Sequence, residues 1–285
     1  PIGIPYVMGM DHLIFPMFIG VILAMVVDAL LLYKFFDTKV FPARGTWPPG
    51  IATAEAIKAG DEGGKRAKFL LAGIGIGLLG SLLKIPMSAF GVAFIGNIWA
   101  LAMFGLGLLI SAYSPSLLGI NLGEFYIPQG FMIGAGIVSL IQVMFIIFSK
   151  KNNGQIEQMA AMKGSKETRN GFTFGFAAYL SVSILIALLG GLYAKLSIGM
   201  LIAFLLYVTV AAFAHEFIVG IAAMHAGWFP AFAVAVITLV IGIVIGFPPE
   251  ALVLLAGFSA CTGVAFADMG YDLKTGYILR GNGKD

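Results

Sequence analysis

Apolar residues form long runs along the chain, and short polar stretches separate these runs. They cover residues 13–36, 69–83, 86–113, 126–148, 172–194, 198–224, 229–247 and 251–267. A helix needs about 20 residues to cross the roughly 30 Å hydrocarbon core of a bilayer, and most of the runs reach or approach that length. The pattern therefore predicts an all-α fold: a polytopic transmembrane helical bundle of about seven or eight spans, with a helix break or a re-entrant segment.

Basic residues collect in the polar stretches and predict which side of the membrane they face. Lys and Arg are frequent in residues 37–68, in the loop 149–171 and at the end of the chain. The positive-inside tendency places all three stretches in the cytoplasm. The loop then joins two halves, 1–148 and 172–285, of a single transmembrane domain that covers the whole chain, 1–285.

The number of crossings in the first half is ambiguous. Two cytoplasmic stretches require an even number of crossings between them, whereas three apolar runs lie there. Either one of these runs is re-entrant, or the polar stretch around Trp47 itself dips into the membrane. The sequence leaves both alternatives open.

Composition narrows the classes of function. Of the 285 residues, 60% are hydrophobic and 11% are charged, and the mean hydropathy is +0.99, so most of the surface must face lipid. The net charge of +3 arises from loop residues without interleaved aromatic side chains, which argues against a nucleic-acid partner. A single cysteine, Cys261, excludes an internal disulfide and a Cys-x-x-Cys redox pair.

His215 and Glu216 are adjacent in an apolar run and raise the question of a metal enzyme. Membrane zinc proteases use H-E-x-x-H, but the position four residues after His215 is Val219. The Gly-x-Gly-Asp motif of intramembrane aspartyl proteases is also absent from the sequence. We therefore predict no catalytic residues, no metal and no cofactor, and an intramembrane hydrolase is disfavoured.

Asp28 and Glu216 are acids inside apolar runs. A charge at the centre of a membrane helix costs about 2.5–3.5 kcal/mol, so such groups face the bundle interior or a wet cavity and mark proton or ion pathways. Both residues are candidates for a proton-coupling site. Each has a structural alternative: Asp28 lies about two turns before Lys34 and reaches the interface if the helix tilts, and Glu216 forms with His215 a pair that bonds to a neighbouring helix.

The first polar segment, here called the Trp47 segment (residues 47–55), reads Trp-Pro-Pro-Gly-Ile-Ala-Thr-Ala-Glu. Pro49 and Gly50 predict a helix break, followed by a short helix over residues 51–59. Free amide groups at the start of that helix attract anionic groups, and Glu55 follows one turn later. The segment is a candidate substrate-binding site, although an ordinary cytoplasmic turn has the same Pro-Pro-Gly pattern.

The second polar segment, here called the Asp268 segment (residues 268–277), closes the last apolar run. Asp268 and Asp272 are four residues apart, which places both carboxylates on one helical face, and Lys274 can neutralise one of them. Tyr277 ends the segment. A polar gate or coupling site is one interpretation, and a capped, solvated helix end is the other.

The two segments together resemble the oligopeptide transporter family, which includes the yellow-stripe-like metal-chelate carriers. The Trp47 segment is similar to that family's aromatic-Pro-x-Gly segment, and residues 272–277 are similar to its Asp-Phe/Leu-Lys-Thr-Gly-Tyr segment. Trp47 stands where the family usually has Phe or Tyr, and the pair His215-Glu216 matches no family motif. Because family members are longer, the chain resembles a central portion of one.

The resemblance implies a multi-pass secondary transporter of the cell membrane that takes up short peptides or peptide-like metal chelates together with protons. A channel and a non-transporting membrane scaffold stay open as alternatives, and so does homo-oligomer formation. The candidate substrate-binding residues are Pro49, Gly50, Glu55, Asp268, Asp272, Lys274 and Tyr277, and the candidate coupling residues are Glu216 and Asp28.

Overall fold

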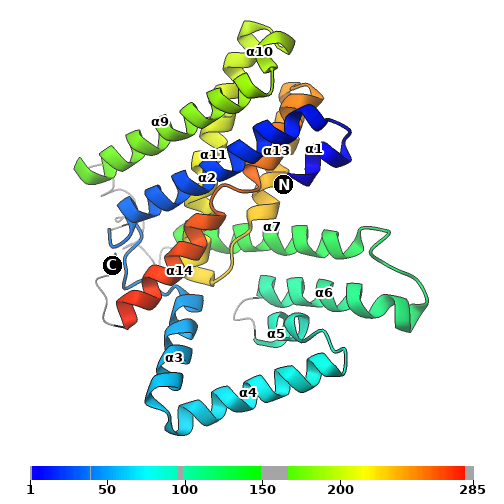
Figure 1. Ribbon diagram of the computed structural model, residues 1–285, viewed down its shortest axis with the longest axis vertical. Coiled ribbons are helices and arrows are strands. Elements are labelled where there is room, and N and C mark those ends of the chain that lie inside the picture. Colours follow the sequence, from blue (N-terminus) through cyan, green and yellow to red (C-terminus); the bar gives the residue numbers. More distant parts are fainter. Residues whose placement is uncertain (1, 39, 96–98, 149–165, 280–285) are drawn as a thin grey trace.

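A computed structural model describes residues 2–38, 40–95, 99–148 and 166–279, and the elements in these ranges are helices (Figure 1). In the first half they are α1 (Gly3–Val7), the 3₁₀ turn η1 (Asp11–Leu13), α2 (Ile14–Phe35), α3 (Pro48–Glu62), α4 (Gly64–Leu82), α5 (Met87–Ile95), α6 (Trp99–Leu118) and α7 (Ile127–Phe148). In the second half they are α9 (Lys166–Leu189), α10 (Leu192–Lys195), α11 (Ile198–Ala226), α12 (Ala231–Ile245), α13 (Pro249–Ser259) and α14 (Val264–Ile278). The all-helical prediction is confirmed for the described residues.

Five helical stretches among the described residues are long and apolar enough to cross a bilayer. They are Asp11–Phe35, Trp99–Leu118, Arg169–Leu189, Ile198–Ala226 and Pro249–Ile278. Large apolar side chains on these stretches, such as Phe15 and Leu206, are exposed, and hydrocarbon is the solvent that suits them. The five stretches indicate a membrane-embedded protein.

The packed core forms where α2 meets helices of the second half. Helix α2 packs against α9, α13 and α14, and α11 packs against α9, α13 and α14 (Figure 1). Close approach needs small residues: a Cβ atom on Gly20 of α2 would lie 2.7 Å from Ile186 Cγ2 of α9. The side chains of α2 that face this core are therefore surrounded by protein.

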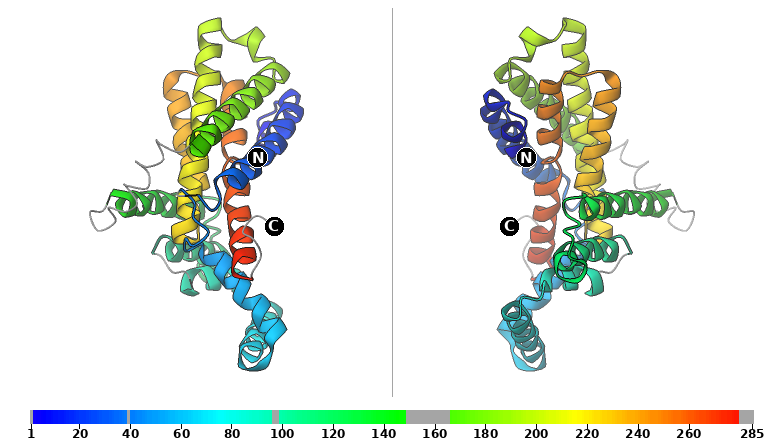
Figure 2. Two further views of the ribbon diagram at one scale, coloured as in Figure 1. Left: turned by 90° about the vertical axis from the view of Figure 1, so that its left-hand side faces the viewer. Right: turned by 90° about the vertical axis from the view of Figure 1, so that its right-hand side faces the viewer.

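The remaining helices of the first half form an arm and a layer beside the core. Figure 2 shows α3 and α4 projecting from one end of the molecule. Helices α5, α6 and α7 pack in sequence order, and α7 then contacts α11 and α12. The first half is thus joined to the second half through α2, through α3 on α14, and through α7.

Two predicted boundaries in the first half are wrong. The short helix expected over residues 51–59 is the longer α3, Pro48–Glu62, because Pro fits the first turn of a helix and Pro49 and Gly50 are part of that turn. The chain turns instead at Trp47, which has a left-handed φ of 38°. The single run expected over residues 86–113 contains two helices, α5 and α6, on either side of residues that the structure does not describe.

Two predicted boundaries in the second half are also wrong. The loop 149–171 falls outside the described residues up to position 165, but its last residues already belong to α9, which begins at Lys166. The last apolar run, 251–267, is interrupted between α13 and α14, where Gly263 has a φ of +83°. Helix α14 then continues through Asp268 to Ile278, so the apolar run does not end its helix at Asp268, and the Asp268 segment forms most of α14, including its last turn.

Candidate functional site

Asp28 is completely buried near the middle of the packed core. It lies on α2, and its relative exposure is 0%. The nearby Lys34 lies over the Phe174 ring, with 4.8 Å from Nζ to the ring centroid, and not beside the acid. Asp28 therefore faces the interior of the bundle, and the alternative in which it reaches the interface is wrong.

Glu216 and Tyr179 meet Asp28 in this interior. The Tyr179 hydroxyl, on α9, lies 2.7 Å from Asp28 Oδ1 and 2.7 Å from Glu216 Oε2, on α11. All three side chains have relative exposures of 0%. We call Asp28, Tyr179 and Glu216 the acid cluster; it joins three helices that are each long enough to span a bilayer.

The geometry of the acid cluster requires a proton on one of the two carboxyl groups. A phenol carries one hydrogen, so Tyr179 can donate to only one of its two carboxyl neighbours. The second 2.7 Å contact is a hydrogen bond only if the other carboxyl group is protonated and donates to the phenol oxygen. Two bare carboxylates on one buried hydroxyl would also repel each other strongly. The two contacts thus fit a cluster in which one carboxyl group is ionised and the other carries a proton.

The break between α13 and α14 indicates where that charge resides. The Gly263 N–H donates to Asp28 Oδ2 at 2.8 Å, and the start of α14 presents its positive dipole end to the same carboxylate. Glu216 Oε1, in contrast, has no hydrogen-bond partner among the described residues. The arrangement favours a carboxylate on Asp28 and a carboxylic acid on Glu216 that donates to the Tyr179 oxygen.

His215 takes part in a separate network although it adjoins Glu216 in the sequence. Its Nδ1 lies 3.1 Å from the Ser259 carbonyl oxygen and its Nε2 lies 2.7 Å from Thr238 Oγ1. A neutral imidazole meets both contacts when Nδ1–H donates to Ser259 and Nε2 accepts from Thr238, whose single hydroxyl hydrogen then points to this nitrogen instead of to the Val234 carbonyl oxygen 2.9 Å away. His215 thus links α11 to α12 and α13. Among the described residues, no three His, Cys, Asp or Glu side chains are grouped as metal ligands.

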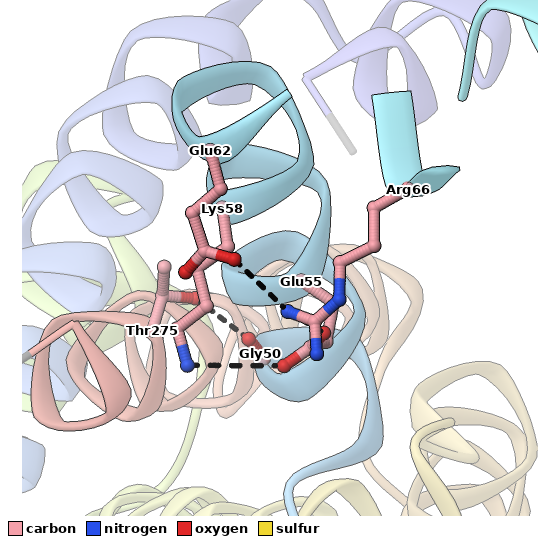
Figure 3. Close-up of polar contacts among 6 residues, drawn as sticks. All are labelled: Gly50, Glu55, Lys58, Glu62, Arg66 and Thr275. Carbon is pink, nitrogen blue, oxygen red and sulfur yellow. Dashed lines mark hydrogen bonds and ion pairs between the residues drawn. The ribbon is translucent and has the colours of Figure 1, made fainter. Parts of the chain in front are cut away.

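The Trp47 and Asp268 segments, more than 200 positions apart in the sequence, are packed against each other. Helix α3 lies on α14, and Thr275 Oγ1 donates to the Gly50 carbonyl at 3.1 Å (Figure 3). A Cβ atom on Gly50 would lie 2.5 Å from the Tyr271 carbonyl oxygen, so only glycine permits this approach. Pro49 and Gly50 therefore provide a close helix–helix contact.

Lys274 stabilises the chain between α2 and α3. Its Nζ donates to the carbonyl oxygens of Ala43 and Gly45, each at 2.8 Å, and the residue is only 6% exposed. Among the described residues it forms no ion pair with Asp268 or Asp272. The expectation that Lys274 neutralises one of these acids is therefore wrong, because backbone carbonyls occupy its ammonium group.

Glu55 lies on the exposed side of α3 and has a different role from the residues that pack α3 against α14. Its carboxylate lies 3.2 Å from Arg66 Nη1 and 3.8 Å from Lys58 Nζ, and its side chain is 49% exposed (Figure 3). Exposed pairs of this kind contribute about 0–1 kcal/mol. Glu55 therefore belongs to the α3–α4 arm, and within the described ranges its ion pairs are with Lys58 and Arg66 and not with another candidate residue.

Of the predicted substrate-binding residues, Asp268 lines a cavity between the helices. This cavity, which we call the apolar pocket, has a volume of about 720 Å³ and lies between α12, the α13–α14 pair and the layer of α6 and α7. Asp272 is exposed one turn further along α14, and the Tyr277 ring lies 5.6 Å from Lys274 Nζ. The two polar segments are thus brought together by packing, whereas only one of their side chains reaches the pocket.

The sequence did not point to Tyr179 of the acid cluster or to Gly263, whose N–H donates to the cluster. Tyr179 is a single hydroxyl-bearing aromatic residue inside an apolar run, which is a weak signal because buried tyrosines commonly bond to backbone. Gly263 follows Cys-Thr in a cluster of small residues, a composition that permits a helix break. Among 38 glycines, that signal is easily overlooked.

The chain was compared with models of known protein families, with curated proteins and with solved structures, and none of the three comparisons gave a match.

Proposed function

We propose that this protein is a proton-coupled secondary carrier of the oligopeptide transporter type, a multi-pass protein of the cell membrane. The observation that carries the proposal is the acid cluster, in which two buried carboxyl groups both lie 2.7 Å from the hydroxyl of Tyr179. Ionisable groups are rare at such a place because they are expensive, and their usual role there is to relay protons or bind ions.

The helix break next to the cluster supports the same function. Transporters commonly place their coupling and substrate sites at discontinuous helices near the membrane midplane. Here the 30-residue stretch Pro249–Ile278 is interrupted at Gly263, and the broken end of α14 holds Asp28. Protonation of Asp28 would remove the charge that the dipole of α14 stabilises, so a change in proton occupancy alters the contact between α2 and α14.

The proposal includes a bundle of about seven or eight spans. Five long apolar stretches and two shorter apolar helices, Ile127–Gln142 and Ala231–Ile245, together give seven. A shorter helix crosses where it lies nearly along the membrane normal or where the bilayer thins around it. As substrates we propose small organic solutes, with short peptides and peptide-like metal chelates as the class that the resemblance implies.

Reconstitution into liposomes that contain a pH-sensitive dye tests the function. Addition of a mixture of di- to tetrapeptides, with and without a chelated metal ion, is expected to acidify the lumen, because solute and proton enter together. The signal should saturate with peptide concentration and vanish when a protonophore is present. Unsaturable electrical currents would indicate a channel, and a complete absence of flux would indicate a scaffold.

A further inference from the structure

The apolar pocket has the size and character of a site for a small organic molecule. Its volume of about 720 Å³ lies within the range of roughly 300–1,000 Å³ that is typical of ligand sites. Its large side chains include Phe104 of α6, Met132 of α7, Trp228 and Phe232. The rings of Phe104 and Trp228 lie 5.7 Å apart, which brings the layer of α5–α7 into contact with the second half.

One wall of the pocket is the same helix break that holds Asp28. Ala260 and Cys261 line the pocket, whereas Gly263, two positions after Cys261, donates its N–H to Asp28. A molecule in the pocket would therefore touch a segment whose far side contacts the acid cluster. This connection gives a physical route by which occupancy of the pocket and proton occupancy of the cluster influence each other.

The described lining of the pocket carries a negative charge and no positive one. Asp268 is the single charged side chain among its described lining residues, and it forms no ion pair with any described residue. No Lys or Arg lines the pocket within the described ranges, so a carboxylate or phosphate on the ligand would have no cationic partner. A positive charge, in contrast, would meet a carboxylate and aromatic side chains, both of which attract cations.

We infer that the apolar pocket binds an apolar organic cation, a molecule with one positively charged group and a hydrophobic body. The identification of this molecule as the transported solute rests on the proposed carrier function. It narrows the substrate class: peptides with a free amino group, apolar side chains and a blocked carboxyl end fit the pocket, and acidic peptides or anionic chelates do not.

Cys261 makes the inference directly testable because it is the single cysteine of the chain and lines the pocket. The experiment measures how fast a small maleimide alkylates Cys261 in the purified protein in detergent. Two probes of nearly the same size and shape but opposite charge are compared, tetraphenylphosphonium and tetraphenylborate. Tetraphenylphosphonium is expected to slow alkylation with saturation, at concentrations about 10-fold lower than tetraphenylborate needs.

Two carboxylate-to-amide variants locate the source of the charge preference. Asp268→Asn should remove the difference between the two probes while both still slow alkylation, since the apolar walls remain. Asp61→Asn, on the exposed arm, should keep the difference. The rate of alkylation without a probe reports whether the pocket of each variant is intact.

Three results would overturn the inference. Equal protection by both probes would mean that the pocket is an apolar groove, as for lipid, without a preference for charge. No protection by either probe would mean that the pocket is not a binding site. Alkylation that speeds up on dilution of the protein would show that a second copy covers the pocket. Because the measurement uses no gradient, it succeeds or fails independently of proton-coupled flux, so failure of the pocket and failure of the carrier function are distinguishable.

Discussion

Replacement of Glu216 by glutamine is expected to reduce proton-driven uptake to background while the protein stays folded. Glutamine has nearly the same shape as glutamic acid, and its amide N–H₂ can donate to the Tyr179 oxygen in place of the carboxylic acid proton. It has no proton to release, however. The cluster then keeps its hydrogen bonds and loses its ability to change charge, so transport can no longer draw on the pH gradient.

The measurement is solute-dependent acidification in the dye-loaded liposomes, for the wild type and for Glu216→Gln, Asp28→Asn and Asp61→Asn. The last variant is the matched control, because it makes the same carboxylate-to-amide change on an exposed helix. Both cluster variants should give no acidification, and the control should behave as the wild type does. If Glu216→Gln retains gradient-driven uptake, the acid cluster does not couple protons to transport.

Substitution of Gly263 by alanine is expected to produce the largest loss of stability. Gly263 has a φ of +83°, and a left-handed conformation costs a residue with a side chain about 1–2 kcal/mol. A Cβ atom there would also lie 2.9 Å from Val219 Cβ, and such overpacking adds about 1–3 kcal/mol. A backbone shift that relieves the clash would also disturb the hydrogen bond from the Gly263 N–H to Asp28.

Gly191→Ala separates the cost of the left-handed backbone from the cost of the clash with Val219. Gly191 has a similar φ of +68°, but no heavy atom lies within 4 Å of the position that its Cβ would occupy. Unfolding in mixed micelles should show a loss of about 1–2 kcal/mol for Gly191→Ala and a clearly larger one for Gly263→Ala. Equal losses in the two variants would mean that the break does not pack against α11 as described.

Much of the fold could be predicted because hydrocarbon imposes simple rules. A backbone inside a bilayer must satisfy its hydrogen bonds within helices, so long apolar runs read directly as helices. Helix ends were less predictable. The turn at Trp47 and the break at Gly263 depend on single residues with positive φ, and the same residue types occur elsewhere without such a turn.

The acid cluster was predicted only as separate residues. The cost of a buried charge singled out Asp28 and Glu216, but sequence distance cannot show that two acids 188 positions apart share one hydroxyl. The residues of the two polar segments illustrate the opposite case. Gly50 and Lys274 have residue types that also suit a binding site, and their packing against Tyr271 and the carbonyl oxygens of Ala43 and Gly45 depends on tertiary structure.

Infrared spectroscopy of the purified protein at neutral pH tests the proton of the acid cluster most directly. Exposed Asp and Glu side chains are ionised there, so the carbonyl band of a protonated carboxylic acid reports a sheltered group. We predict that the wild type shows such a band, that Glu216→Gln loses it and that Asp28→Asn retains it. A spectrum without the band, or a band that Glu216→Gln leaves unchanged, would contradict the account.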